Sequence, residues 1–306
     1  LLYNGIVIVS QGEPSGRGAN GIAGIDATTG KSLWYAPLSG SGTPTPAIVD
    51  GQLVNHDSTG ELEVFDPTTG TERWHKNLGT HAHASAITPI SPTAFVTAGD
   101  DPDDVVAMDV RSRKILWRAP LPADARSAGS TYLAYDGTRI FGMYFAPRAA
   151  TEKAPYHATQ RLYALDAKTG HTLWSADVAS GVAQERFLSS IPLVHDDTVY
   201  AGSPLAPTFS AFDTVTGKPR WSVTLGAPAA RGSVLKDNVI YVPTTSGTVY
   251  ALAANDGHVI GQHTFPDVFV DTSPSIAGDS LVIGGDHGYV FAMPLAAIRA
   301  SNADTP

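Results

Sequence analysis

The sequence predicts an all-β protein, a β-propeller of four-stranded antiparallel blades, and three observations support this prediction. A short box of residues recurs along the chain at intervals of about 40 to 57 residues, and all five tryptophans occupy one position in it. A repeat of ~40–45 residues is typical of a four-stranded propeller blade. Short alternating strands separated by turn residues fill each repeat. Helical periodicity is absent almost throughout.

The box itself is the clearest repeated feature. Its best copy is LYALDAKTGHTLW (162–174). The other copies are AGIDATTGKSLW (23–34), EVFDPTTGTERW (63–74), VAMDVRSRKILW (106–117) and SAFDTVTGKPRW (210–221), and YALAANDGHVIG (250–261) is a degenerate copy. A ligand site would not need so many copies. A large flat ring placed over a backbone turn buries much area at a low entropic cost, so the box fits a structural role.

One repeat shows how the strands, lettered A to D from inner to outer, follow each other. In chain order they are TPAIV (45–49), the hairpin pair Asp50-Gly51, QLVNH (52–56), a turn at 57–60, ELEVF (61–65), a turn at 66–70 and TERWHKNL (71–78). The same order fits residues 232–265.

The repeats predict seven blades, with six and eight as alternatives. Residues 5–38 supply strands B, C and D of a first blade without strand A, and five full blades follow to about Phe265. Residues 272–295 supply strands A to C of a last blade, in which Pro294 and Ala300 fill the Asp and Gly positions poorly. The start, LLYNGIVIVS, has no initiator Met and no signal-peptide pattern, so it is interpreted as a strand. We expect the chain to be excised or processed from a longer protein.

The spacing A-x-D-x-x-T-G-K-x-x-W resembles the tryptophan-docking repeat of the pyrroloquinoline-quinone-like (PQQ-like), WD40-like propeller superfamily. The matching residues include Ala164, Asp166, Thr169, Gly170 and Trp174, and again Ala211, Asp213, Thr216, Gly217, Lys218 and Trp221. The resemblance covers essentially the whole chain and implies one PQQ-like propeller domain over 1–306. It also implies that each Trp stacks on the turn of a neighbouring blade. The implied docking residues are Asp26, Gly30, Trp34, Asp66, Gly70, Trp74, Asp109, Trp117, Asp166, Gly170, Trp174, Asp213, Gly217 and Trp221.

Composition excludes several classes of function. The net charge is −9 and the Lys and Arg residues form no cluster, which argues against nucleic acid as a partner. No apolar stretch is long enough to form a transmembrane segment. The chain contains no cysteine, so disulfides, thiolate metal sites and Cys nucleophiles are excluded.

The extra length of the repeats lies on one side of the predicted disc. The B–C and D–A connections share this side, which we call the loop face, and the long segments are 11–20, 99–104, 145–160 and 177–187. Function often resides on loops that a rigid scaffold positions. The site residues predicted there are His81, His83, Arg126, Arg148, Tyr156, His157, Arg186, Arg231 and Asp271.

The predicted site residues allow two chemical interpretations. The arginines could bind a carboxylate or phosphate, or each could pair with a nearby acid such as Glu185 or Asp124. His81 and His83 alternate on a strand, but no third metal ligand is evident, and the acidic stretch GDDPDD (99–104) lacks the spacing of a calcium loop. We therefore expect no metal. The stretch GDHG (285–288) aligns with ordinary B–C turns.

The resemblance is nearest in style to BamB-type propellers, which implies a non-catalytic, extracytoplasmic scaffold or accessory domain, whether periplasmic, secreted or envelope-associated. Its partner would be a protein or peptide on the loop face, including an upstream domain of the same polypeptide. One alternative is a small-molecule binder that uses Tyr144, Tyr156 and the arginines.

The other alternative is an enzyme, either a PQQ-dependent oxidoreductase with calcium or the propeller part of a larger hydrolase. Quinoprotein dehydrogenases are about twice this length, and their PQQ packs on a vicinal disulfide that this chain lacks. We therefore expect no cofactor and no catalytic residue.

Overall fold

The computed structural model describes residues 1–11, 20–40, 45–79, 86–100, 103–122, 125, 132–147, 156–183, 190–270 and 272–300. The chain divides into two compact units. Unit 1 consists of Leu1–Thr138 and Leu165–Thr172, and unit 2 consists of Arg139–Ala164 and Leu173–Pro306. None of the helices in the described ranges is long and apolar enough to cross a membrane.

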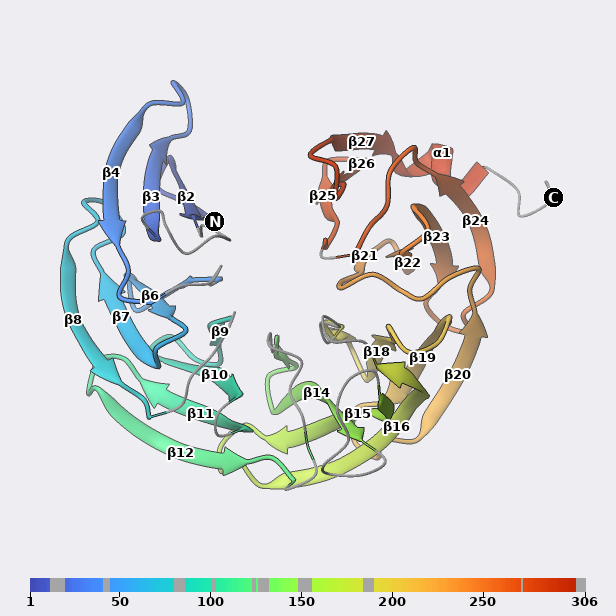
Figure 1. Ribbon diagram of the computed structural model, residues 1–306, viewed down its shortest axis with the longest axis horizontal. Coiled ribbons are helices and arrows are strands. Elements are labelled where there is room, and N and C mark those ends of the chain that lie inside the picture. Colours follow the sequence, from blue (N-terminus) through green and yellow to red (C-terminus); the bar gives the residue numbers. More distant parts are fainter. Residues whose placement is uncertain are drawn as a thin grey trace. The chain divides into compact units, whose positions relative to one another are not determined.

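The fold is an all-β propeller of antiparallel blades, as the repeat predicts (Figure 1). Among the described residues there are seven sheets, six of four strands and a last one of three, and in each the strands follow one another in sequence order.

The first three sheets belong to unit 1. Their strands are β1 (Leu2–Tyr3), β2 (Ile6–Gln11), β3 (Gly21–Asp26) and β4 (Ser32–Pro37); β5 (Ala47–Val49), β6 (Gln52–His56), β7 (Glu61–Phe65) and β8 (Glu72–Asn77); and β9 (Thr88–Pro89), β10 (Ala94–Asp100), β11 (Asp103–Asp109) and β12 (Lys114–Pro120). The boundary between the units runs through the fourth sheet, which contains β13 (Ala134–Tyr135), β14 (Arg139–Pro147), β15 (Tyr156–Asp166) and β16 (Thr172–Ala183).

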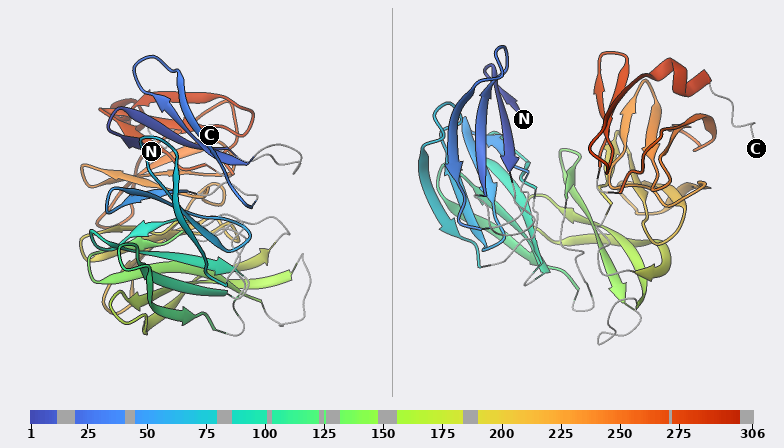
Figure 2. Two further views of the ribbon diagram at one scale, coloured as in Figure 1. Left: turned by 90° about the vertical axis from the view of Figure 1, so that its left-hand side faces the viewer. Right: turned by 45° about the horizontal axis from the view of Figure 1, so that its top comes forward.

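The last three sheets belong to unit 2. Their strands are β17 (Leu193–His195), β18 (Thr198–Gly202), β19 (Thr208–Asp213) and β20 (Pro219–Thr224); β21 (Val234–Lys236), β22 (Val239–Pro243), β23 (Thr248–Ala253) and β24 (Val259–Thr264); and β25 (Ser275–Ala277), β26 (Ser280–Gly284) and β27 (Val290–Pro294). A short helix, α1 (Leu295–Ala300), follows β27 (Figure 2).

The middle strands of a blade are buried on both faces, whereas the outer strand is only half covered. All five residues of β22 are buried, but β20 alternates between exposed and half-buried residues. The apolar runs of the middle strands fit this position, because a strand packed on both sides needs no polar face. In five sheets the register between the third and outer strands shifts by one residue just before the box turn. Such a bulge bends the strand locally.

The box aspartates hold the turn between the third and outer strands. Asp166 accepts hydrogen bonds from the backbone N–H of Lys168 (3.1 Å) and Thr169 (2.8 Å) and from the Thr169 hydroxyl (2.7 Å). The Asp166 N–H donates to the carbonyl of His171 at 2.9 Å and so closes the turn. The donors around the carboxylate lower the pKa of Asp166 below its ordinary value, because they favour its charged form.

The box tryptophans lie against glycines of the following repeat. A Cβ added to Gly170 would be 2.5 Å from the Trp117 ring, and the same holds for Gly70 beneath Trp34, Gly217 beneath Trp174 and Gly257 beneath Trp221. These four glycines have positive φ, which favours glycine as well. Three of the indole N–H groups donate to carbonyls of the same turns, from Trp117 to Ala167 (3.1 Å), Trp174 to Thr214 (3.0 Å) and Trp221 to Ala254 (3.1 Å).

At two joints between neighbouring blades a glycine lies against an aspartate. In one joint the aspartate is on the turn and the glycine on the connection, and in the other their places are exchanged. In unit 1, the Asp57 carboxylate of the β6–β7 turn lies against Gly40, where a Cβ would be 2.6 Å from Oδ2. In unit 2, Asp267 of the β24–β25 connection lies against Gly285 of the β26–β27 turn, where a Cβ would be 2.0 Å from Oδ2. Each joint therefore has room for one side chain only.

The structure corrects three expectations about the elements. The first sheet has its own inner strand, because Leu2 and Tyr3 pair with β2 as β1. The segments at 99–104 and 177–187 are largely strand and not loop, since β10 and β11 pair up to Asp100↔Asp103 and β16 runs to Ala183. The hairpin tolerates Asp104 on β11 because Arg118 forms an ion pair with its buried carboxylate. In the segment 145–160, β14 extends to Pro147 and β15 begins at Tyr156.

Candidate protein-interaction surface

Most of the site residues expected from the sequence lie outside the described residues. These are His81, His83, Arg126, Arg148, Arg186 and Asp271. Tyr156 begins β15, and His157 follows it as an exposed residue of the same strand. Arg231 is half-buried and lies in unit 2, between β20 and β21. The grouping of arginines and histidines expected on the loop face therefore stays a prediction.

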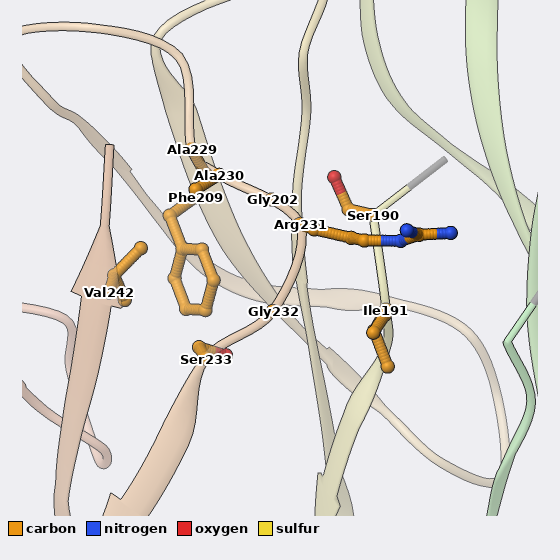
Figure 3. A pocket seen from close by; sticks show the side chains of 10 residues that line it. All are labelled: Ser190, Ile191, Gly202, Phe209, Ala229, Ala230, Arg231, Gly232, Ser233 and Val242. Atoms are coloured by element: carbon orange, nitrogen blue, oxygen red, sulfur yellow. The ribbon is translucent and has the colours of Figure 1, made fainter. Parts of the chain in front are cut away.

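Arg231 lines a narrow recess in unit 2 (Figure 3). Its backbone carbonyl accepts a hydrogen bond of 2.6 Å from the Ile191 N–H, and its side chain points away from Phe209 and passes Ser190 (Figure 3). The recess contains about 180 Å³ of empty space, part of it open to solvent. Pockets that bind drug-sized ligands enclose roughly 300–1,000 Å³. The recess has no interior space for even a water-sized sphere, so it does not form a ligand pocket as it stands.

A more extensive surface is formed by the connection between β24 and β25. Phe269 is fully buried in the core cluster of the last two sheets, where it contacts Phe265 and Phe291 with ring centroids 5.6 and 6.4 Å apart. Its neighbours Val268 and Val270 are 36% and 47% exposed. Burial alternates along the connection, with Asp267 and Phe269 buried and Val268 and Val270 exposed. Burial of Phe269 therefore turns both valines toward solvent.

The β26–β27 turn holds this connection in place. The Val270 N–H donates to the Asp286 carboxylate at 3.2 Å, and the Asp286 N–H donates to the Val268 carbonyl at 3.2 Å. His287 Nδ1 donates to Asp267 Oδ1 at 2.5 Å, and the Val268 N–H donates to the same oxygen at 2.7 Å. We call this set of contacts the clasp.

Electrostatics stabilise the clasp as well. The Asp267 side chain is fully buried, whereas the His287 side chain is 71% exposed. The hydrogen bond from His287 lowers the pKa of Asp267, and the Asp267 carboxylate raises the pKa of His287 above its ordinary value. Protonated His287 therefore neutralises a carboxylate that has no access to water.

Two further apolar residues extend the surface from the turn onto β27. Tyr289 and Val290 are 63% and 74% exposed, and the Tyr289 carbonyl accepts from the Gly285 N–H at 2.8 Å. The apolar quartet is defined as Val268, Val270, Tyr289 and Val290. All four lie at the end of the last sheet where the D–A connection and the B–C turn meet. Four exposed apolar residues on two segments that are bonded to each other make this region the candidate interaction surface.

The sequence analysis did not identify the quartet. It interpreted 285–288 only as an ordinary turn and placed no site residue on β27. Two signals were present, the alternation Val268-Phe269-Val270 and the uncharged stretch YVFAMP at 289–294. Neither has the residue types of a catalytic or metal site. In the part of the chain that the structure describes, no three His, Asp or Glu side chains come together as a metal site.

Comparison with known proteins identifies the family. The family model described as outer membrane protein assembly factor BamB matches residues 4–141 and 158–302. The chain belongs to this family. The BamB of Burkholderia pseudomallei is 25% identical over 276 residues, which are 85% of this chain and 66% of that protein. The crystal structure of BamB from Moraxella catarrhalis has the same fold, with a TM-score of 0.68, 17% identity, and coverage of 94% of this chain and 79% of that one.

The curated relatives of this BamB-family chain carry two different names. Tetrathionate hydrolase of Acidithiobacillus ferrooxidans is 27% identical over 287 residues, which are 91% of this chain and 56% of that protein. The chain thus spans between 56% and 66% of the length of these two relatives. Membership of the BamB family therefore fixes the architecture, and a propeller scaffold by itself hosts unrelated functions.

Proposed function

We propose that this chain is a non-catalytic scaffold that binds a protein partner through the apolar quartet on its loop face. The observation that carries the proposal is the quartet itself, four exposed apolar side chains on a connection and a turn that are fixed to each other by the clasp. Membership of a family described as an outer membrane protein assembly factor supports a protein partner.

The rigidity of the quartet favours binding. A partner that docks on a mobile loop must pay for ordering it, whereas the 266–270 connection is already held by a buried phenylalanine and by hydrogen bonds on both sides. The surroundings resemble the rim of an interface, because the acidic Asp286 and the exposed His287 border the apolar centre.

The same family membership supports a location outside the cytoplasm. The relatives described as assembly factors of outer membrane proteins point to the cell envelope as the place of action. We propose a single propeller domain over 1–306 that acts there as an accessory to a larger assembly, with no cofactor and no nucleic acid.

Site-specific photo-crosslinking tests the proposal. A photoreactive residue at Val268 is expected to give a discrete adduct with one envelope protein, and the substitution Val270→Lys is expected to abolish that adduct. Val215 is the matched control, because it is 60% exposed in unit 2 but lies in a box turn away from the clasp. No adduct from position 268, or the same adducts from 268 and 215, would disprove the scaffold role of the quartet.

A second candidate function is hydrolysis of a small sulfur oxyanion. It is favoured by the relative named tetrathionate hydrolase; Arg231, Ser190 and Ser233 line the recess, which would have to open to admit the anion. An arginine beside hydroxyl groups can bind an oxyanion. The test is turnover of tetrathionate by the purified chain, with Arg231→Met as the variant. Turnover that this substitution abolishes would favour the hydrolase over the scaffold, and the absence of turnover would leave the scaffold.

A further inference from the structure

The joint between the first two sheets contains a buried group of polar side chains, which are Asn55, Asp57 and Glu63. Asn55 on β6 and Glu63 on β7 are directly opposed in the ladder, and so are Leu53 and Phe65, which pack in the core cluster shared with the first sheet. Side chains alternate between the two faces of a sheet, so Asn55 and Glu63 face the first sheet as well. Asn55, Asp57 and Glu63 are 0%, 1% and 4% exposed, so all three are removed from water.

The connection that leaves the first sheet covers this group. Glu63 accepts hydrogen bonds from the Ser39 backbone N–H at 2.9 Å and from the Asn55 amide at 3.2 Å. Asp57, in the turn after β6, places its Oδ2 against the next residue of the connection, where a Cβ at Gly40 would be 2.6 Å away. The Asp57 and Glu63 carboxylates therefore lie against two consecutive residues of one backbone segment. Ser39 itself is exposed, so the group lies just below the surface.

Within the described part of the chain, two oxygen atoms of this group have no hydrogen-bond partner. Asp57 Oδ1 accepts from the N–H groups of Thr59 (2.9 Å) and Glu61 (3.0 Å) and so shapes the turn, but Asp57 Oδ2 accepts no hydrogen bond. Asn55 Oδ1 is likewise unpartnered. Both atoms are shielded from water, and a buried acceptor without a partner is unfavourable. The group therefore needs a partner that donates to oxygen or carries positive charge.

The group also carries a surplus of negative charge. Burial raises the pKa of Glu63 above its ordinary value, and the charge of Asp57 raises it further, while the hydrogen bonds from Ser39 and Asn55 oppose the rise. Glu61, at the other end of the turn, adds a third carboxylate. Among the ion pairs of the described residues, none joins a Lys or Arg to these carboxylates. Buried carboxylates are stable only when a positive charge or a proton neutralises them.

The other joint at which a glycine lies against an aspartate shows how the chain neutralises a buried carboxylate elsewhere. There His287 donates to Asp267 at 2.5 Å and, when protonated, supplies the positive charge. At the first joint, the histidine in register is His75 on β8, which is opposite Glu63 in the ladder. His75 is exposed, however, and hydrogen-bonds to Glu72 at 2.6 Å. The position that His287 fills at one joint is therefore not filled by a described side chain at the other.

We propose that this joint binds a calcium ion through Asn55 Oδ1, Asp57 Oδ2 and the Glu63 carboxylate. Calcium prefers carboxylate and amide oxygens, and its shell of about six to eight ligands is flexible, so water molecules can complete it. The ion gives both unpartnered oxygens a partner and offsets both buried charges. Zinc favours nitrogen and sulfur ligands, and magnesium requires a near-ideal octahedron, which three side chains of one hairpin provide less readily.

The site differs from the metal sites considered in the sequence, which were His81 with His83 and the acidic stretch 99–104. The spacing of 55, 57 and 63 matches no calcium-loop pattern, because the pairing of β6 with β7 brings the ligands together. Two acids and an amide also fall short of three acidic or histidine side chains at one point. The expectation of no metal therefore did not cover a site that forms between two sheets. A calcium ion there fixes the 39–40 connection to the second sheet and stabilises the joint.

Calorimetric titration of calcium chloride into the full chain, freed of metal with a chelator, tests the site. We expect saturable binding and a rise in melting temperature of at least about 3 °C at saturating calcium, with a smaller rise for magnesium at equal ionic strength. Asp57→Asn keeps the Oδ1 acceptor of the turn, and Glu63→Gln keeps an acceptor for the Ser39 N–H. Each variant is expected to weaken calcium binding at least tenfold. If one of the two does not fold, the other still decides.

Asp267→Asn is the matched control, because it alters the buried acid of the other joint, where His287 already supplies the charge. It should leave the calcium affinity within twofold of that of the unchanged chain, even if it lowers the melting temperature. Three results would overturn the inference. The absence of saturable heat would mean that a proton on Glu63 neutralises the joint. Equal affinity in the unchanged chain and in both variants would assign the ion to another acidic segment, such as 99–104. An equal rise in melting temperature with magnesium would indicate a general ionic effect.

Discussion

The guanidinium of Arg113 lies over the Trp74 ring, 5.2 Å from its centroid. In the four other Trp–turn contacts a glycine occupies this position beneath the tryptophan. Arg113 keeps the backbone conformation of those glycines, with a φ of 58°. A cation over the ring therefore preserves the contact, although the left-handed backbone of Arg113 costs conformational free energy.

This relationship predicts different outcomes for substitutions at two equivalent turn positions. Arg113→Gly relieves a backbone cost of roughly 1–2 kcal/mol and loses a cation–π contact of about 0.5–1 kcal/mol. We expect its free energy of unfolding to change by less than about 1 kcal/mol, the difference of these terms. Gly170→Ala combines a positive φ with a Cβ only 2.5 Å from Trp117, so we expect a loss of more than about 1 kcal/mol. Denaturant unfolding measures both, and equal losses would contradict the role of the glycine.

The clasp predicts a pH dependence of the 266–270 connection. The raised pKa of His287 contributes stability below its ordinary value of 6.5, and this contribution is lost as the pH rises through the raised pKa. The lowered pKa of Asp267 contributes above 3.8, and this contribution is lost as the pH falls through the lowered pKa. Asp286 also faces His287 and raises its pKa further.

We therefore expect the amide of Val268 to be most protected from hydrogen exchange between about pH 4 and 6.5 and less protected at alkaline pH. Protection factors measured across this range test the prediction. In His287→Ala the alkaline decrease should disappear. The same decrease in the variant would show that another group causes it.

The contact between Gly261 and α1 predicts a specific cost for a small substitution. Gly261→Ala would place a Cβ 2.4 Å from the Ile298 carbonyl and force the helix away, which should cost about 1–3 kcal/mol. Gly284→Ala is the control, because the nearest atom to its Cβ would be 3.9 Å away. It should be neutral or stabilising by up to about 1 kcal/mol. Thermal unfolding distinguishes the two variants, and similar melting temperatures would contradict the packing role of Gly261.

Calorimetric titration with PQQ, with and without calcium, tests the expectation that the chain binds no cofactor. We expect no saturable heat under either condition, because the chain lacks the cysteines on which the cofactor packs in quinoprotein dehydrogenases. Saturable micromolar binding would revive the quinoprotein alternative. In that case Arg126, Arg186, Arg231 and Asp271 would be the residues to substitute first.

The blades could be predicted from the sequence because each repeat carries its own local signals. The turn at Asp50-Gly51 and the boxes that end at Trp74 or Trp174 contain residue types that favour particular turn conformations. The two ends of the chain were harder. β1 is only Leu2 and Tyr3, too short for a periodic pattern, and α1 has six residues, too few for helical periodicity.

The candidate surface could not be predicted because its residues are ordinary in sequence. Val268 and Val290 are exposed because their neighbours Phe269 and Phe291 pack in or against the core. That depends on packing between sheets, which a single strand does not reveal. The predicted site residues, in contrast, were selected by residue type. A charged residue such as Arg231 is conspicuous in a sequence, but its type does not reveal what it contacts.

The exchanged pair at the two joints, Asp57 against Gly40 and Asp267 against Gly285, bears on how a repetitive chain avoids misassembly. Nearly identical blades risk docking on the wrong neighbour while the protein folds. If the turn carrying Asp57 met the connection carrying Asp267, two carboxylates would compete for space that holds one. If the turn carrying Gly285 met Gly40, a void would remain. The exchanged positions of aspartate and glycine therefore make each joint specific for its own partner. We expect a chain with swapped or permuted blades to fold more slowly but to reach the same final architecture.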